Sequence, residues 1–342
     1  MPMDLWALYG STLKSRLFEE AVARLWYDGL ISGEMHLGTG EEAIIAGVVT
    51  QLREGDAMAL DHRGTAAMLM RGVEPVLILR ELLGRPDGLC GGMGGHMHLF
   101  SRKHLAASSG IVGAEGPAAA GYGLSAQYLR PGAIAVAFFG DGAMNQGMLM
   151  ESMNLASAWK LPVLFVCKDD GWAITTESVK VTGGDLVERV RAFGIPTADV
   201  DGCEVFEVWE AARSAIERAR GGQGPSFLHA RCIHLEGHFL GFPLAQGMSD
   251  TIREMPRTVL PLAQSVLTPG GAALRERVTG MKTFLGTVRS ALNDPRRDPE
   301  NDPVRRLRKA LPSDPERLRG LEEQVEKEIS RALESALGEM PS

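Results

Sequence analysis

The chain has 342 residues, which is long enough to bury one large hydrophobic core or two small ones. Apolar residues make up 44% of it, and the formal net charge of −7 argues against the broad basic surface on which nucleic-acid binding usually depends. Because the longest strongly apolar run, residues 133–139, is too short to span a bilayer, we expect a soluble protein that binds neither nucleic acid nor membrane. The four cysteines are too far apart for a metal knuckle or a redox pair, which favours a reducing, cytoplasmic setting.

Helices are expected in the first part of the chain. The spacing of apolar residues predicts an amphipathic helix over 3–29, without the basic start and apolar core of a secretion signal. Similar patterns predict helices over 41–52 and 74–83. The glycine-rich segment 88–100 lacks the pattern of a P-loop, so its glycines are expected to allow close packing.

The middle of the chain alternates between strands and helices. The apolar runs 133–139 and 161–167 show no polar alternation, which is typical of parallel strands covered on both faces. A helical pattern over 147–159 lies between them and completes a βαβ unit. The pattern repeats with a strand, a helix and a strand at 197–200, 204–220 and 225–233. We therefore predict an α/β fold with a doubly wound parallel sheet flanked by helices.

The last hundred residues differ in composition. Residues 1–243 are expected to form the α/β domain, and the Pro-, Arg- and Asp-rich stretch 244–301 to be an insert or flexible excursion with one helix near 272–292. Residues 302–342 are expected to be a C-terminal helical extension that completes the same domain or contacts a partner. Ser313 and Glu316 suggest a capping box at its start. An apolar seam follows, made of Leu318, Leu321, Val325, Ile329 and Leu333.

Polar loops follow the two strands of the βαβ unit. In open parallel sheets ligands bind beyond the carboxyl ends of the strands, so the loops at 140–147 and 168–176 are the first candidates for a site. Asp141 and Asp170 lie in these loops, and a pair of carboxylates there is suited to bind Mg²⁺ together with phosphate oxygens. Lys168 is expected to be a surface residue at the strand end, and Asp169 to be either solvated or in contact with the residues that bind the ligand.

The histidines do not spell out a zinc motif. Two groups of histidines lie close together in sequence: His96 with His98, and His229 with His234 and His238. Neither group has a suitably spaced cysteine or the spacing of zinc ligands on a helix, so zinc is not expected at either.

Several segments resemble one enzyme family. The Gly-Asp-Gly of residues 140–142, followed after 26 residues by a polar pair and Gly-Trp, is similar to the thiamine diphosphate motif. Further segments match in order and spacing: HLGTGEEA at 36–43, HRG at 62–64, the glycine-rich run at 82–100, GIVGAEGPAAAG at 110–121, WKLPVLFVC at 159–167 and GH at 237–238. From about residue 12 to 240 the chain resembles the alpha subunit of the E1 component of 2-oxo acid dehydrogenase complexes, which include the pyruvate, branched-chain and acetoin enzymes.

The resemblance implies a thiamine diphosphate-binding fold, the cofactors thiamine diphosphate and Mg²⁺, and a separate beta subunit in an α2β2 assembly. It assigns the metal to Asp141, Asp170 and the carbonyl of Trp172, and it assigns acid–base roles to His238 and, second, to His36. The full set of implied cofactor-binding residues is His36, His62, Arg63, Gly110, Val112, Gly140, Asp141, Gly142, Ala143, Asp170, Trp172 and His238.

The resemblance also implies an activity. Such a subunit would take part in decarboxylating a 2-oxo acid, or in cleaving acetoin, and the acyl unit would pass to a lipoyl acyltransferase (E2) or to another acceptor. One alternative is a two-component acyloin-forming enzyme outside a large complex. Another is a cofactor-deficient structural or regulatory subunit, because Asp170 replaces the family's usual Asn and His234 its usual Arg.

Overall fold

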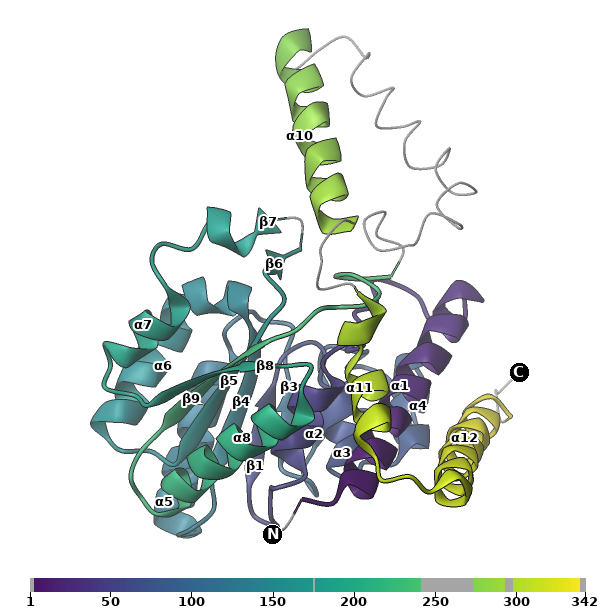
Figure 1. The fold of residues 1–342 in the computed structure, drawn as a ribbon, viewed down its shortest axis with the longest axis horizontal. Helices are drawn as coiled ribbons and strands as arrows, with labels where there is room; N and C mark the ends of the chain where they lie inside the picture. Colours follow the sequence, from purple (N-terminus) through teal and green to yellow (C-terminus); the bar gives the residue numbers. More distant parts are fainter. Residues whose placement is uncertain (1–2, 175, 241–272, 293–297, 339–342) are drawn as a thin grey trace.

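The computed structural model describes residues 3–174, 176–240, 273–292 and 298–338. Within them, the largest sheet has seven strands in the order β2-β3-β1-β4-β5-β9-β8 (Figure 1). Neighbouring strands pair in parallel except β2, which runs antiparallel to β3. The strands are β1 (Ala57–Leu60), β2 (Phe100–Ser101), β3 (Ala106–Ser108), β4 (Ala135–Gly140), β5 (Val163–Asp169), β8 (Thr197–Asp201) and β9 (Ser226–Arg231). A separate hairpin joins β6 (Trp172–Ala173) to β7 (Thr176–Glu177).

The central strands are buried on both faces. In β4, Val136 and Phe138 belong to one hydrophobic core, whereas Ala137 and Phe139 belong to a second core on the opposite face. Helices α2 (Glu42–Val49) and α8 (Val205–Arg220) supply side chains to the first core, while α5 (Glu115–Leu129) and α6 (Gly147–Ala158) supply the second. Burial on both faces explains the absence of polar alternation in the sequence, and the expected doubly wound parallel sheet is confirmed.

Seven further helices lie within the described residues. They are α1 (Leu5–Tyr27), α3 (Thr65–Met70), α4 (Pro75–Leu82), α7 (Leu186–Arg191), α10 (Leu274–Leu292), α11 (Pro303–Ala310) and α12 (Pro315–Leu337), with short 3-10 turns η1 (Asp141–Asn145), η2 (Ser178–Lys180) and η4 (Pro299–Asn301). No described helix has the length and hydropathy of a membrane span.

Two elements near the site were not predicted from the pattern. β1 has only four residues, and α5 is rich in glycine and alanine, so neither shows a clear period. The small residues of α5 allow close packing: a Cβ at Gly116 would lie 2.8 Å from Leu149, and one at Gly123 would lie 2.7 Å from Val163.

The glycine-rich segment that follows α4 is held by one carboxylate. Glu81 accepts hydrogen bonds from the backbone N–H groups of Cys90, Gly92 and Gly94. A Cβ at Gly92 or Gly94 would lie 2.5 Å or less from a backbone oxygen, so the expectation of packing glycines is confirmed.

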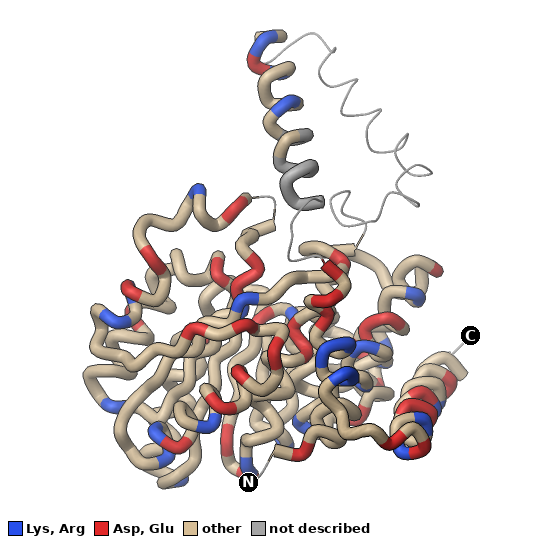
Figure 2. Tube along the Cα trace, viewed as in Figure 1, with Lys and Arg blue, Asp and Glu red and all other residues tan. Residues whose placement is uncertain are grey.

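The C-terminal helices pack onto the N-terminal helix. α12 contacts α1 and α4 (Figure 1), and Val325 and Ile329 are buried in this contact with Leu333 beside them. The apolar seam expected there is therefore confirmed. Figure 2 shows acidic and basic residues interspersed along the rest of α12.

The start of α12 differs from the prediction. Asp314, rather than Ser313, is the N-cap, and its carboxylate accepts a hydrogen bond from the backbone N–H of Arg317 at 3.0 Å. The capping box of Ser313 with Glu316 is wrong, because the carboxylate of Asp314 sits at the cap position itself.

The expected insert at 244–301 falls mainly on residues 241–272 and 293–297, which lie outside the described residues. Of its described part, α10 confirms the helix expected near 272–292 and extends away from the sheet (Figure 1).

Two segments that are distant in sequence run side by side next to the sheet. The backbone N–H of Leu235 donates to the carbonyl of Thr39, and that of Leu240 donates to the carbonyl of Met35. Gly40 makes this approach possible, because its φ is +101° and a Cβ there would lie 1.8 Å from the carbonyl oxygen of Ile233. The contact brings the segments that carry His36 and His238 together.

Gly40→Ala is expected to lower the free energy of unfolding by more than about 3 kcal/mol, because a left-handed backbone and a direct clash with backbone act together. Gly33→Ala is the matched control, since Gly33 also has a positive φ of +87° but has no atom near its Cβ position. The control should cost only about 1 kcal/mol. Denaturant unfolding followed by circular dichroism measures both, and equal losses would contradict the importance of the close approach.

Candidate functional site

A cavity of about 420 Å³ lies at the carboxyl ends of β1, β3, β4 and β5. In the sheet, β3 lies on one side of β1 and β4 lies on the other side. The strand order therefore reverses between β1 and β4, and the cavity lies at this point. Every cofactor-binding residue implied by the resemblance lines this cavity, from His36 to His238. The tertiary structure therefore gathers residues from five separate motifs at one place.

Two carboxylates from neighbouring strands face the cavity. Asp141 follows β4 and is 1% exposed, and Asp170 follows β5 and is 8% exposed. Burial, together with the nearby charges of Asp170 and Asp169, raises the pKa of Asp141 well above its usual range. The Ser178 hydroxyl donates a hydrogen bond to Asp141 and partly offsets this effect. This concentration of buried carboxylates is an electrostatic environment that a cation would stabilise.

Asp170 and His234, the two residues that differ from the pattern of the family that the sequence resembles, contact each other. His234 Nδ1 forms an ion pair with Asp170 Oδ2 at 2.8 Å, and His234 Nε2 lies 2.7 Å from Glu41 Oε1. Burial opposes ionisation of Asp170, but the charges of His234 and Arg63 outweigh it and lower the pKa of this carboxyl. The extra negative charge at position 170 is thus balanced by the residue that replaces arginine at position 234.

The expectation that Lys168 is a surface residue is wrong. Its side chain is 1% exposed, and its Nζ lies 2.6 Å from Glu41 Oε2 and 3.0 Å from Asp61 Oδ2. Burial opposes the charge of this ammonium, yet Asp61 and Glu41 outweigh that effect and raise its pKa. Because both carboxylates lie far from it in sequence, the strand-end position of Lys168 gave no sign of the pairing.

Arg63 joins two of the segments around the cavity. Its guanidinium is buried and donates hydrogen bonds to the carbonyl oxygens of Leu37 and His238. Its Nε lies 4.0 Å from Glu41 Oε1. These bonds hold the two histidine-bearing segments in position, in addition to any contact with a ligand.

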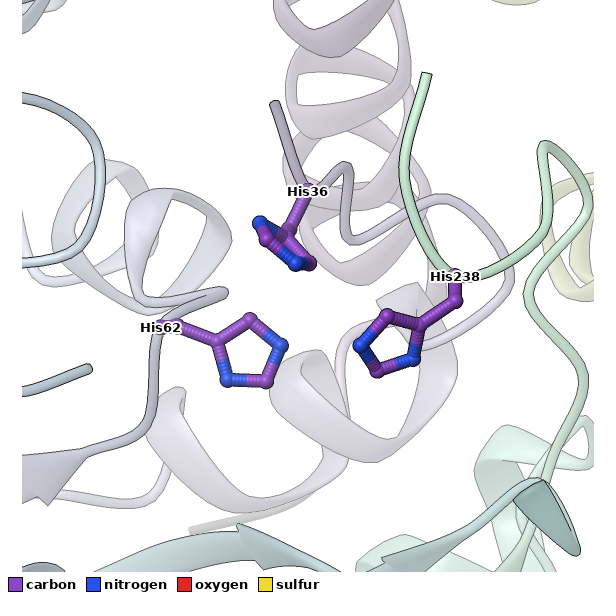
Figure 3. A group of neighbouring side chains, drawn as sticks. All are labelled: His36, His62 and His238. Carbon is purple, nitrogen blue, oxygen red and sulfur yellow. The ribbon is translucent and has the colours of Figure 1, made fainter. Parts of the chain in front are cut away.

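Three histidines surround one side of the cavity (Figure 3). The ring centroid of His36 lies 4.7 Å from that of His62 and 5.1 Å from that of His238. His36 Nδ1 is 2.9 Å from His96 Nε2, so a fourth histidine orients the His36 ring from behind. Sequence reasoning considered His96 only for zinc and missed this role, since its partner lies 60 residues away.

The pKa values of the acid–base candidates differ from the expectation of titration near neutrality. Burial, followed by the charge of Arg63, lowers the pKa of His36 to about 2 and that of His238 to about 3. The same two causes lower the pKa of His62 further. All three rings are therefore neutral at pH 7, and their surroundings disfavour the protonated form.

Histidines outside the cavity have structural partners. His229, which belonged to one of the groups considered for zinc, lies 2.7 Å from Asp169 and 2.9 Å from Asp199. Asp169 is thereby tied to β9 and is only partly exposed, rather than solvated. Its carboxylate still lies close to Asp141, whose pKa it helps to raise.

Glu115, at the start of α5, is a further lining residue that sequence reasoning missed. It is 3% exposed, and burial followed by the charge of Asp61 raises its pKa to about 8. Glu115 belongs to the motif GIVGAEGPAAAG, but nothing in that motif distinguishes Glu115 from the residues beside it.

The contribution of Glu115 to stability is expected to fall as pH rises from about 4.5 to 8, because folded Glu115 holds a proton that the unfolded chain releases above its ordinary pKa of 4.5. The slope is up to about 1.4 kcal/mol per pH unit. Glu115→Gln should weaken this dependence in denaturant unfolding at pH 5 and pH 8. Glu151→Gln, at an exposed position, is the control, and identical pH profiles for the two variants would contradict the prediction.

Comparisons with known proteins identify the family of the chain. Residues 11–265 match the family model described as "Dehydrogenase E1 component". The chain is 36% identical to the alpha subunit of acetoin:2,6-dichlorophenolindophenol oxidoreductase from Cupriavidus necator over 89% of this chain and 93% of that protein. It is 37% identical to the pyruvate dehydrogenase E1 alpha subunit of Zymomonas mobilis, over 76% of this chain and 74% of that one. The Bacillus subtilis counterpart of the acetoin protein is 38% identical, over 69% and 72%. The chain belongs to the dehydrogenase E1 component family, as an alpha subunit of the thiamine-diphosphate-dependent oxidoreductases.

Proposed function

We propose that this chain is the alpha subunit of an enzyme that decarboxylates a small 2-oxo acid or cleaves acetoin, with thiamine diphosphate and Mg²⁺, and transfers the acyl unit to a lipoyl group or another acceptor. The observation that carries the proposal is the cavity at the strand ends, which joins Asp141 and Asp170 to Arg63, His36 and His238. The relatives described above are named for acetoin and pyruvate, which favours a short acyl group.

The donor atoms fit Mg²⁺. Carboxylates at 141 and 170 together with the carbonyl of Trp172 are hard oxygen ligands, and Mg²⁺ commonly uses one or two carboxylates plus phosphate oxygens. A divalent ion would also offset the crowding of negative charge that raises the pKa of Asp141. Asp170 would contribute as a charged oxygen ligand in place of the family's usual amide.

The surrounding backbone fits a diphosphate. Gly142 and Ala143 lie in the turn η1, where β4 leads into α6, and helix N-termini favour anions. Gly110 and Val112 line the opposite wall after β3. When bound, thiamine diphosphate supplies a nucleophilic carbon and an electron sink for the loss of CO₂ or of an aldehyde.

The chain's own residues position groups and carry protons. His238 and His36 are neutral at pH 7, so each ring offers one N–H donor and one nitrogen acceptor to a reacting group, and a bound anion near Arg63 would raise the pKa of both rings toward the range that suits proton transfer. His96 orients the His36 ring, and Arg63 fixes His238 through its backbone carbonyl. The protein in this way supplies imidazole groups that are fixed in position at the cavity.

A beta subunit is proposed to cover the cavity mouth. Val112 and Ile174 line the cavity but are 51% and 54% exposed, and Ile111 beside them is 61% exposed. Apolar side chains gathered around an opening favour burial against another protein. This supports an α2β2 assembly in which the site is completed by the beta chain.

The possible roles of the chain differ in the acceptor and the cofactor that each requires. Activity that requires a lipoylated acceptor favours a role in a complex with an E2 acyltransferase, whereas acyloin formation without that acceptor favours a two-component enzyme outside a complex. A cofactor-deficient subunit would bind no thiamine diphosphate even with its beta chain. The ion pair of Asp170 with His234 argues against this last alternative, because it keeps the carboxylate ionised.

Calorimetric titration of thiamine diphosphate with Mg²⁺ is expected to show binding to the co-purified α–β pair and little to the chain alone. Asp141→Ala should weaken binding at least about tenfold, because it removes a charged metal ligand. Glu151→Gln is the control and should bind normally. Absence of binding to the pair would contradict the proposed function.

Asp170→Asn is expected to retain cofactor binding, because an amide oxygen can still ligate Mg²⁺ and His234 keeps its contact with Glu41. The same titration measures it, with circular dichroism to verify folding. Complete loss of binding in a folded variant would contradict the assignment of residue 170 to the metal.

A further inference from the structure

A row of three polar side chains crosses neighbouring strands beside the cavity. Asp169, His229 and Asp199 lie on β5, β9 and β8, which are adjacent in the sheet (Figure 1). His229 is in register with Asp199 on one side and with Cys167, two residues before Asp169, on the other. Residues in register on parallel strands point to one face, and so do residues two apart on a strand, so all three side chains lie on the same face.

His229 bonds the carboxylates on both sides of it. Its Nε2 lies 2.7 Å from Asp169 Oδ2, and its Nδ1 lies 2.9 Å from Asp199 Oδ1. An ionised carboxylate accepts hydrogen bonds but does not donate them, so both ring nitrogens donate and the ring carries a positive charge. Burial alone would lower the pKa of His229, but Asp169 and then Asp199 outweigh burial and raise it. Asp199 also accepts a hydrogen bond from Arg231.

The other oxygen of Asp169 reaches the turn that carries two of the proposed metal ligands. Asp169 Oδ1 accepts a hydrogen bond from the backbone N–H of Gly171 at 2.8 Å. Gly171 lies between Asp170 and Trp172, which both line the cavity. The two oxygens of one carboxylate therefore connect His229 to this turn.

We propose that His229, held in place by Asp199, is a positioning residue for the metal ion. It fixes the carboxylate of Asp169 and thereby the turn from which the Asp170 carboxylate and the Trp172 carbonyl reach Mg²⁺. The proposal rests on the proposed function, which places Mg²⁺ at this turn. Groups that orient metal ligands without touching the ion commonly change metal affinity about 10–100-fold when they are removed.

His229 also explains why a third carboxylate can lie next to the metal site. β5 lies between β4 and β9, so Asp169 has Asp141 on one side and His229 on the other. The charge of His229 balances that of Asp169 from the side of β9. The hydrogen bonds to His229 and to the turn occupy both oxygens of Asp169, which leaves Asp141 and Asp170 as the carboxylate ligands.

Two amide substitutions of His229 with different reach test the proposal. The side-chain nitrogen of Gln can take the place of Nε2 and donate to Asp169, whereas that of Asn lies near Nδ1 and reaches only Asp199. Calorimetric titration of thiamine diphosphate into the co-purified α–β pair, repeated at a series of Mg²⁺ concentrations, gives the Mg²⁺ concentration for half-maximal binding. His229→Asn should raise this concentration at least about tenfold, and His229→Gln no more than about threefold.

Denaturant unfolding of the same variants separates positioning from stability. A purely structural role of His229 would lower the free energy of unfolding and leave the Mg²⁺ requirement of the two variants equal. His104→Gln is the matched control, because His104 bonds Ser101 outside the cavity and should leave the Mg²⁺ requirement unchanged. Asp199→Ala, at a side chain that is 44% exposed, is the second variant in case His229→Asn does not fold. It removes the outer support and should raise the Mg²⁺ requirement about threefold or more.

The outcomes distinguish this proposal from the proposed function. A wild-type pair that binds no thiamine diphosphate would overturn the proposed function and this proposal with it. Normal binding by the wild type, with equal Mg²⁺ requirements for His229→Asn and His229→Gln, would overturn this proposal alone. An unchanged Mg²⁺ requirement in folded Asp199→Ala would do the same.

Discussion

The buried ammonium of Lys168 is the interaction on which the cavity depends. From the end of β5 it reaches Glu41, which precedes α2, and Asp61, which follows β1. One charge therefore joins three segments at the carboxyl edge of the sheet. Removing one partner of such a buried pair typically costs about 3–5 kcal/mol, because the remaining charges cannot be hydrated. All three residues line the cavity, so this arrangement fixes three of the segments that form it.

The network extends from Lys168 to the rest of the site. Glu41 also contacts His234, which pairs with Asp170, and Arg63 lies beside Glu41. As a result the carboxylates and the cationic and imidazole side chains of the cavity act on one another. The charges of His234 and Arg63 keep Asp170 ionised at the end of β5, and the charge of Arg63 keeps the imidazoles neutral. Oxygen ligands for a hard metal and imidazole groups are thus combined in one cavity.

Much of the site could be predicted because motifs carry local information. The apolar run at 133–139, which has no polar alternation, predicted a buried strand, and the structure contains β4 there. The glycines on either side of Asp141 predicted the loop at the end of that strand. The histidine and arginine of the HRG motif were also predicted, and they line the cavity. What could not be predicted were pairings between distant residues, such as Lys168 with Glu41, which are 127 residues apart. Neither residue type nor spacing indicates which carboxylate a buried lysine will meet.

By itself, the sequence determined the fold class and the strand-end location of the site, since periodicity and glycine placement act over short distances, and its resemblance to a known family supplied the motif residues. Only the tertiary structure decided how those residues interact: that Asp170 is balanced by His234, that His96 orients His36, and that His62 joins His36 and His238. Coulomb forces and metal coordination depend on distances of a few ångströms, and the packing of the helices on the sheet sets those distances.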